Sequence, residues 1–165
     1  MRLSKLTKVL LWGANIWFFG EGLLGPLLAV FTEKIGGDIL DISWAWACFL
    51  IATGTCYIIT GRLINNKSRK SKAILMITGY GMNAIFTFCY LLVSTPEKLF
   101  IVQVCLGISE AMGSPTWDAL YAKSLSESND GYAWGLAGGQ SQIVTGLAIL
   151  AGRFLIYYFS FDGIS

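Results

Sequence analysis

Long apolar segments recur along the sequence, and only short polar stretches separate them. Five are predicted, covering residues 9–32, 42–63, 73–94, 99–123 and 132–161. A helix of ~20 apolar residues, rising ~1.5 Å per residue, crosses the ~30 Å hydrocarbon core of a bilayer. The pattern therefore predicts an all-α integral membrane protein in which residues 1–165 form a single transmembrane domain of five spans.

The overall composition agrees with this fold class. Hydrophobic residues make up 55% of the chain and charged residues 13%, whereas soluble domains are about 25% charged. The mean hydropathy is +0.60. The net charge of +2 is small, and Lys and Arg lie at span ends rather than in a stripe interleaved with aromatic residues. We therefore expect the lipid bilayer as a partner and no nucleic acid.

The chain contains no histidine, and its four cysteines lie inside apolar segments without the spacing of metal ligands. Histidine metal sites and Ser-His or Cys-His nucleophile pairs are therefore excluded. The cysteines are interpreted as small buried hydrophobic residues. We expect no catalytic residue, no metal and no cofactor, so an enzyme is not predicted.

Basic residues are unevenly shared between the two sets of span ends. Nine lie in the amino tail, the loop after the second span and the loop after the fourth, whereas two, Lys34 and Lys98, lie at the opposite ends. Cytoplasmic loops of membrane proteins are enriched in Lys and Arg. We therefore expect a multi-pass protein of the cell (inner) membrane, with a cytoplasmic amino terminus and, after five spans, an external carboxyl terminus.

Two of the expected spans carry a carboxylate deep inside an apolar segment, Glu21 in the first and Glu110 in the fourth. Each stands five residues before a proline, Pro26 or Pro115, and 13 residues from a lysine at the predicted inner end of its helix. Both acids should therefore lie ~20 Å along their helices from the same membrane face. An ionisable group at the bilayer centre costs at least ~2.5 kcal/mol and usually marks a pathway. Both are candidates for substrate contact or proton transfer, the alternative being a structural acid bonded to a neighbouring helix.

The loop between the second and third spans contains Gly61-Arg-Leu-Ile-Asn-Asn-Lys-Ser-Arg-Lys70. It resembles the signature loop of the major facilitator superfamily, Gly-x-x-x-Asp-(Arg/Lys)-x-Gly-(Arg/Lys)-(Arg/Lys). Gly61, Arg69 and Lys70 agree, whereas the usual acid, the first base and the second glycine are replaced. The fourth-span stretch from Gly107 to Leu120 and the Trp134-Gly-Leu-Ala-Gly-Gly opening of the fifth are also similar to this family, so the resemblance covers nearly the whole chain.

The resemblance implies a secondary transporter of about twelve helices, whose two halves each contain a 3+3 inverted repeat. This chain would then correspond to the amino-terminal half without its sixth helix, the connection to which is expected at Asp162–Ser165. The missing carboxyl-terminal helices or a second half would be partners. Within the repeat, the first and fourth helices are symmetry mates that line a central cavity, where Glu21 and Glu110 would meet.

Three further residues are assigned to the substrate or proton pathway: Asn15, Asn83 and Trp117. Interhelical hydrogen bonding is the alternative for the two amides. Trp117 shares one helical stripe with Glu110. That stripe, which is mostly small or amphipathic, is completed by Gly113, Ser114 and Tyr121.

A cytoplasmic gate is also implied by the resemblance, because an acid at the inner end of the fourth helix often pairs with the basic loop in this family. Asp118 is the acid, and the loop side is assigned to Gly61, Arg62, Arg69 and Lys70. A side chain that simply reaches water is the alternative for Asp118. The predicted function is secondary active transport of a small solute, with proton coupling. The competing hypothesis is a small membrane subunit or interaction protein that transports nothing itself.

Overall fold

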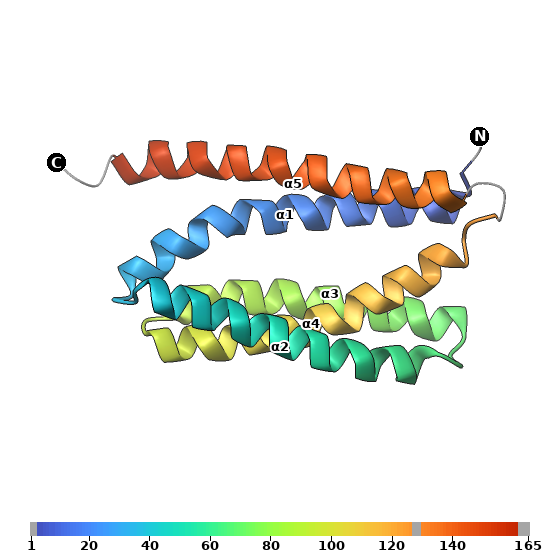
Figure 1. Cartoon of the computed structure of the whole chain (residues 1–165), viewed down its shortest axis with the longest axis horizontal. Helices are drawn as coiled ribbons and strands as arrows, with labels where there is room; N and C mark the ends of the chain where they lie inside the picture. The colour runs from blue at the N-terminus through green and yellow to red at the C-terminus, as the bar shows by residue number, and fades with distance from the viewer. Residues whose placement is uncertain (1–2, 127–129, 162–165) are drawn as a thin grey trace. The chain divides into compact units, whose positions relative to one another are not determined.

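Five α-helices and one short 3₁₀-helix make up the described part of the chain (Figure 1). The computed structural model describes residues 3–126 and 130–161. The helices are α1 (Lys5–Lys34), α2 (Ile39–Ile64), α3 (Arg69–Phe88), η1 (Cys89–Leu92), α4 (Pro96–Ala122) and α5 (Asp130–Phe161). These two ranges contain no β-strand, so the predicted all-α fold class is confirmed. The expected connection to a sixth helix, at Asp162–Ser165, lies outside the described residues.

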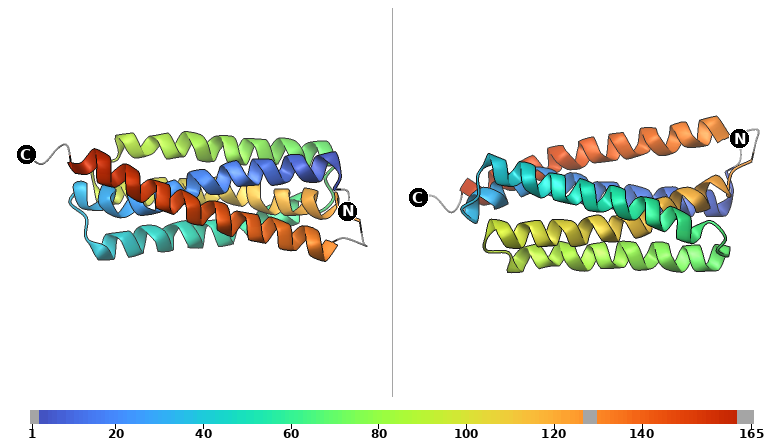
Figure 2. Two further views of the ribbon diagram at one scale, coloured as in Figure 1. Left: turned by 90° about the horizontal axis from the view of Figure 1, so that it is seen from above. Right: turned by 60° about the horizontal axis from the view of Figure 1, so that its bottom comes forward.

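The helices divide into two compact units, each described by itself. One, which we call the α2–α4 unit, is Thr32–Lys123 and contains α2, α3, η1 and α4. Within it, α4 lies between α2 and α3 and contacts both (Figure 2). The other, the α1–α5 unit, comprises Met1–Phe31 and Ser124–Ser165 and so contains most of α1 together with α5.

Short polar segments end one helix and start the next. After α1, Gly36 adopts a φ of 78°, a left-handed conformation that glycine tolerates without steric cost. Asp38 then caps α2: its carboxylate accepts a hydrogen bond from the Asp41 N–H, and the Asp41 side chain accepts one from the Asp38 N–H. At α4, Thr95 is the N-cap and Pro96 stands in the first turn, where its missing N–H costs nothing. Both connections therefore follow from residues that act on their own backbone.

Glycines let α4 approach both of its neighbours closely. A Cβ added at Gly107 would lie 2.6 Å from the Phe49 carbonyl oxygen and 2.8 Å from Oγ1 of Thr53, both on α2. A Cβ at Gly79 of α3 would lie 2.7 Å from the Gly113 nitrogen of α4. Small residues bring membrane helices into this kind of backbone contact. α4 is therefore the central packing element of its unit.

Proline and hydroxyl side chains interrupt the regularity of α4. The helix continues through Pro115, which can donate no backbone hydrogen bond, and changes direction along its length (Figure 1). Ser109 and Thr116 donate their hydroxyl protons to the carbonyls four residues earlier, which also tends to bend a helix. The change of direction along α4 thus has two local causes, the proline and the hydroxyl side chains.

Three helical stretches are long and apolar enough to cross a bilayer, among the residues that the structure describes: Ile39–Ile64, Arg69–Leu92 and Pro96–Ala122. They overlie the second, third and fourth predicted spans. The first and fifth overlie α1 and α5, which are 30 and 32 residues long. Membrane crossing by these two helices, and hence the count of five spans, stays a prediction.

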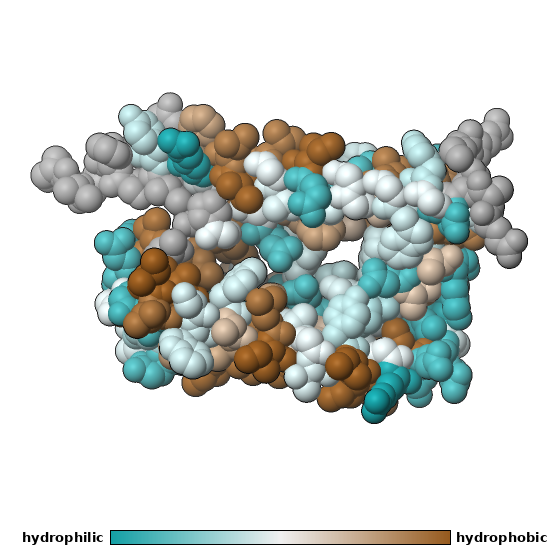
Figure 3. Space-filling view, in the orientation of Figure 1, coloured by the Kyte–Doolittle hydropathy of each residue, from teal (hydrophilic) through white to brown (hydrophobic). Residues whose placement is uncertain are grey.

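The outer surface of the α2–α4 unit carries many apolar side chains (Figure 3). On α3 and η1, Ile77, Phe88 and Leu91 are 67%, 72% and 83% exposed. Water would make such a surface an association hazard, whereas hydrocarbon does not. The exposed apolar side chains thus agree with a membrane protein.

Candidate functional site

Two carboxylates lie along α4 inside the α2–α4 unit. Glu110 and Asp118 are both half-buried, and the Oε2 atom of Glu110 is fully buried. They are eight residues apart, or ~12 Å along the helix axis. Since eight residues are slightly more than two turns, both side chains project to similar sides of α4.

A tyrosine of α2, Tyr57, interacts with both of these acids. The Tyr57 hydroxyl of α2 donates a hydrogen bond of 2.5 Å to Oδ2 of Asp118. The same hydroxyl lies within electrostatic range of Tyr80 on α3 and of Glu110. We call these four residues, Tyr57, Tyr80, Glu110 and Asp118, the α4 acid cluster. It brings three helices together around a polar centre within an apolar unit.

Asp118, the acid of the expected cytoplasmic gate, bonds a different partner in this structure. Arg62, Arg69 and Lys70 are exposed at the end of α2 and the start of α3. Within the described residues, none of these bases forms an ion pair with Asp118, whose bonded partner is Tyr57. Gly61 is half-buried near the end of α2. The gate assignment of the loop residues stays a prediction.

The stripe of α4 that carries Glu110 is largely a packing surface. A Cβ at Gly113 would come within 3.0 Å of the Tyr80 ring, so this glycine gives Tyr80 room beside α4. Trp117 stacks on Tyr121 with ring centroids 4.6 Å apart and an interplanar angle of 11°. Tyr121 is fully buried. Gly113 and Tyr121 therefore serve the helix contacts, while Trp117 and Ser114 are half-buried.

Asn83 is used to join two helices. Its side chain is 7% exposed, and its amide group donates to the Leu106 carbonyl of α4 at 3.4 Å. Of the two interpretations open for this residue, the interhelical hydrogen bond is the one formed here.

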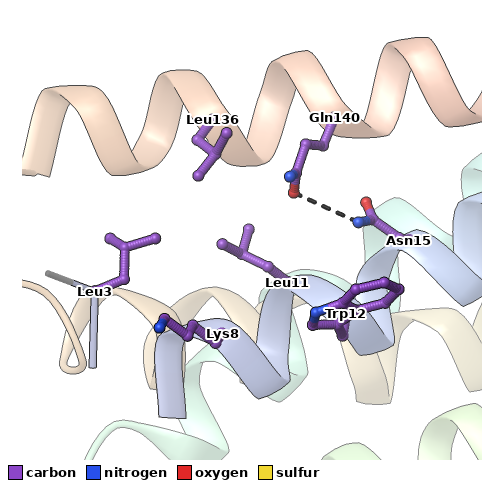
Figure 4. A pocket seen from close by; sticks show the side chains of 7 residues that line it. All are labelled: Leu3, Lys8, Leu11, Trp12, Asn15, Leu136 and Gln140. Atoms are coloured by element: carbon purple, nitrogen blue, oxygen red, sulfur yellow. Dashed lines mark hydrogen bonds between the residues drawn. The ribbon is translucent and has the colours of Figure 1, made fainter. Parts of the chain in front are cut away.

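Asn15 lies in a groove of the α1–α5 unit (Figure 4). The groove has a volume of about 280 Å³ and is lined by Leu3, Lys8, Leu11, Trp12, Asn15, Leu136 and Gln140. Asn15 and Gln140 point toward one another, and the Asn15 amide donates to Oε1 of Gln140 at 3.5 Å, the long end of the hydrogen-bond range. A bond this long is easily exchanged for one to a ligand. The groove combines an ammonium group, two amides and an indole.

Glu21 is exposed on α1. The next residue, Gly22, faces α5 instead, because a Cβ there would lie 2.7 Å from Cβ of Ala148. Glu21 belongs to the α1–α5 unit and Glu110 to the α2–α4 unit. Their sharing of a cavity stays a prediction.

Sequence reasoning missed the tyrosines of the acid cluster, although it contained a signal for one of them. Tyr57 stands five residues before Arg62 and Asp118 five residues before Lys123, so both lie at similar depth below the same membrane face. A hydroxyl and a carboxylate at equal depth on neighbouring helices are natural partners. Tyr80 is brought to the cluster by the α3–α4 contact, which no local pattern reveals.

No group of three or more His, Cys, Asp or Glu side chains in the described part of the chain could hold a metal ion.

Known proteins identify the family of this chain. The Major Facilitator Superfamily profile matches residues 10–164. An "Uncharacterized MFS-type transporter", YitZ of Bacillus subtilis (strain 168), is 24% identical over 143 residues, which cover 87% of this chain and 85% of that protein. No solved structure matches the chain. Together with the all-α architecture and its membrane-compatible helices, these matches show that the chain belongs to the Major Facilitator Superfamily of membrane transporters.

Proposed function

We propose that this chain performs secondary active transport of a small solute, coupled to protons, as the leading part of a larger transporter. The observation that carries the proposal is the α4 acid cluster, in which two carboxylates and two tyrosines meet inside a unit of apolar helices. The further helices would come from additional sequence or from a partner chain. No enzymatic reaction is proposed for this transporter-family member.

Carboxylates inside a membrane protein need a reason to be there. Ionisable side chains in spanning helices are expensive, face a bundle interior or wet cavity, and mark proton or substrate routes. Glu110 lies deeper in α4 than Asp118, which is nearer the helix end at Lys123. Tyr57 interacts with both acids. A proton could thus pass between Glu110 and the inner face by way of Asp118.

The solute pathway is assigned to Glu21, Asn15 and Trp117 together with Glu110. Glu21 is exposed on an otherwise largely apolar helix, and a carboxylate so placed should face a wet passage rather than hydrocarbon. Asn15 lies in the groove beside Lys8 and Gln140, which offers donors and acceptors to a polar solute. Asn83 is assigned to the same pathway, and its amide also bonds the Leu106 carbonyl of α4.

The proposed setting is the cell membrane, with the amino terminus inside and the carboxyl terminus outside. In that orientation the loop with Arg62, Arg69 and Lys70 faces the cytoplasm, beside the end of α4. Asp118 would exchange its Tyr57 partner for one of these bases when the inner side closes. Such an exchange supplies the two alternative arrangements that alternating access requires.

Uptake measurements test the proposal directly. Membrane vesicles are prepared from cells that express the gene in its genomic context and from cells that lack it. A mixture of small solutes is supplied under an acid-outside gradient, and the amount of each solute inside the vesicles is quantified. A solute that accumulates only with the protein present, and is lost when a protonophore is added, supports the proposal. Protein-dependent accumulation that resists the protonophore removes proton coupling. No protein-dependent solute under any gradient favours the non-transporting subunit.

A further inference from the structure

The groove between α1 and α5 has polar groups at its two ends and apolar groups between them. Its α1 side is one face of the helix, at i, i+3, i+4 and i+7, formed by Lys8, Leu11, Trp12 and Asn15. Leu136 and Gln140, four residues apart on α5, form the facing side. Figure 4 shows Lys8 at one end of the groove and the Asn15–Gln140 pair at the other. The two leucines lie between these ends.

The charge in the groove is a single positive one. Lys8 is the one ionisable side chain among the described residues that line it, so the lining offers its ammonium group no carboxylate. A cationic solute would be repelled here. One ammonium group is matched by one negative charge, which a carboxylate carries, whereas a phosphate monoester carries about two. The charge therefore favours a carboxylate as the anionic group of a ligand.

The amide pair can bond a second polar group of the same ligand. The bond of 3.5 Å between the amides engages one N–H of Asn15 and the carbonyl oxygen of Gln140. Because a side-chain amide has two N–H donors and an acceptor oxygen, each residue has further groups to offer. Asn15 follows Lys8 by seven residues, or ~10.5 Å along the helix axis. A ligand that reaches both therefore carries polar groups at opposite ends of its body.

The middle of the groove is suited to a short apolar body. Leu11 is buried and Leu136 half-buried, and the exposed indole of Trp12 adds an aromatic surface. The volume of about 280 Å³ is at the lower limit of the ~300–1,000 Å³ found for ligand pockets. A single ring or a short carbon chain fits this size.

We propose that the groove binds a small amphipathic carboxylate, a monoanion whose apolar body ends in a hydrogen-bonding group. Lys8 pairs with the carboxylate, and Asn15 and Gln140 bond the distal group. The leucines and the indole contact the body between them. That this ligand is the transported solute rests on the proposed function, whereas its binding in the groove does not.

Equilibrium dialysis with four related compounds tests the ligand class. The full chain is held in phosphatidylcholine nanodiscs, and empty nanodiscs correct for partition into lipid. The reference compound is para-hydroxyphenylacetate; its primary amide removes the charge, tyramine reverses the charge, and phenylacetate removes the hydroxyl. The reference acid should bind saturably, the amide should bind about tenfold more weakly, and tyramine should not bind. Equal affinities for the acid, the amide and tyramine would overturn the proposal.

Two variants locate the binding in the groove. Lys8→Gln should weaken binding of the reference acid about tenfold and leave binding of its amide unchanged. Gln140→Leu should weaken the reference acid by ~2–10-fold and leave phenylacetate unchanged, because only the hydroxylated compound bonds the amide. Lys5→Gln and Gln142→Leu replace exposed residues of the same two helices outside the groove lining and should bind as wild type. Lys8 is exposed, so its variant remains informative if Gln140→Leu does not fold.

Uptake of the reference acid into vesicles containing the whole transporter is measured separately. Groove-dependent binding without protein-dependent uptake supports the site and counts against the proposed transport. Protein-dependent uptake of other solutes, with no saturable binding of the acid, overturns the site and leaves the transport standing. Equal losses of binding in Lys8→Gln and Lys5→Gln would also overturn the site.

Discussion

Replacing Tyr57 with phenylalanine isolates the hydrogen bond that joins α2 to α4. The substitution removes the hydroxyl that donates to Asp118 and keeps the ring. A hydrogen bond to a charged group contributes about 1.5–3 kcal/mol, whereas one between neutral groups contributes about 0.5–1.5 kcal/mol. If Asp118 is ionised, Tyr57→Phe should therefore lower the free energy of unfolding by ~1.5–3 kcal/mol. At ~2–4 °C per kcal/mol for a chain of this size, the midpoint falls by ~3–12 °C.

The assay is thermal unfolding in detergent or nanodiscs, with Tyr132→Phe as the matched control. Tyr132 is 54% exposed at the start of α5, so loss of its hydroxyl should change stability by less than ~0.5 kcal/mol. A double-mutant cycle with Asp118→Ala then isolates the pair. In the Asp118→Ala background, Tyr57→Phe should be nearly neutral. Equal losses for Tyr57→Phe and Tyr132→Phe, or an undiminished loss in the Asp118→Ala background, would refute the reasoning.

Two further predictions concern packing and topology. Gly107→Ala places a methyl group 2.6 Å from the Phe49 carbonyl oxygen, whereas Gly54→Ala on α2 meets nothing within 4 Å. Both gain helix propensity, but overpacking should leave Gly107→Ala less stable than Gly54→Ala by ~1–3 kcal/mol in thermal unfolding, and equal stabilities would contradict the close α2–α4 contact. Reporter fusions should read as cytoplasmic after Lys67 and external after Ser165, because basic residues favour the inner side. A cytoplasmic signal after Ser165 would mean that α1 or α5 does not span.

The helices could be predicted because their causes are local. Apolar length sets the spans, and the turns follow from residues that act on their own backbone, such as Gly36, Asp38 and Pro96. The family could also be predicted, since it rests on short motifs read directly along the chain. The end of α3 could not be predicted in the same way. Cys89–Leu92 forms a 3₁₀-helix, and no side chain caps its start.

Only those site residues were predicted whose position along an apolar segment is sufficient to mark them. Glu110 and Asp118 stand out because carboxylates are rare in apolar segments. Their partners depend on the rotation of α2 and α3 about their axes, which close contacts at Gly79, Gly107 and Gly113 set. That is why Tyr57, rather than an arginine, bonds Asp118 here. It is also why the Asn83 amide bonds the Leu106 carbonyl of α4.

Glu110→Gln provides the most direct test of a proton-coupled pathway along α4. In vesicles containing the whole transporter, wild type should both accumulate solute in a proton gradient and exchange internal for external solute without one. The amide keeps the shape of the side chain and cannot carry a proton. Glu110→Gln should therefore retain exchange and lose accumulation, at an unchanged protein level, while Glu33→Gln, at an exposed acid near the end of α1, should retain both. Accumulation by Glu110→Gln at the wild-type level would contradict the account.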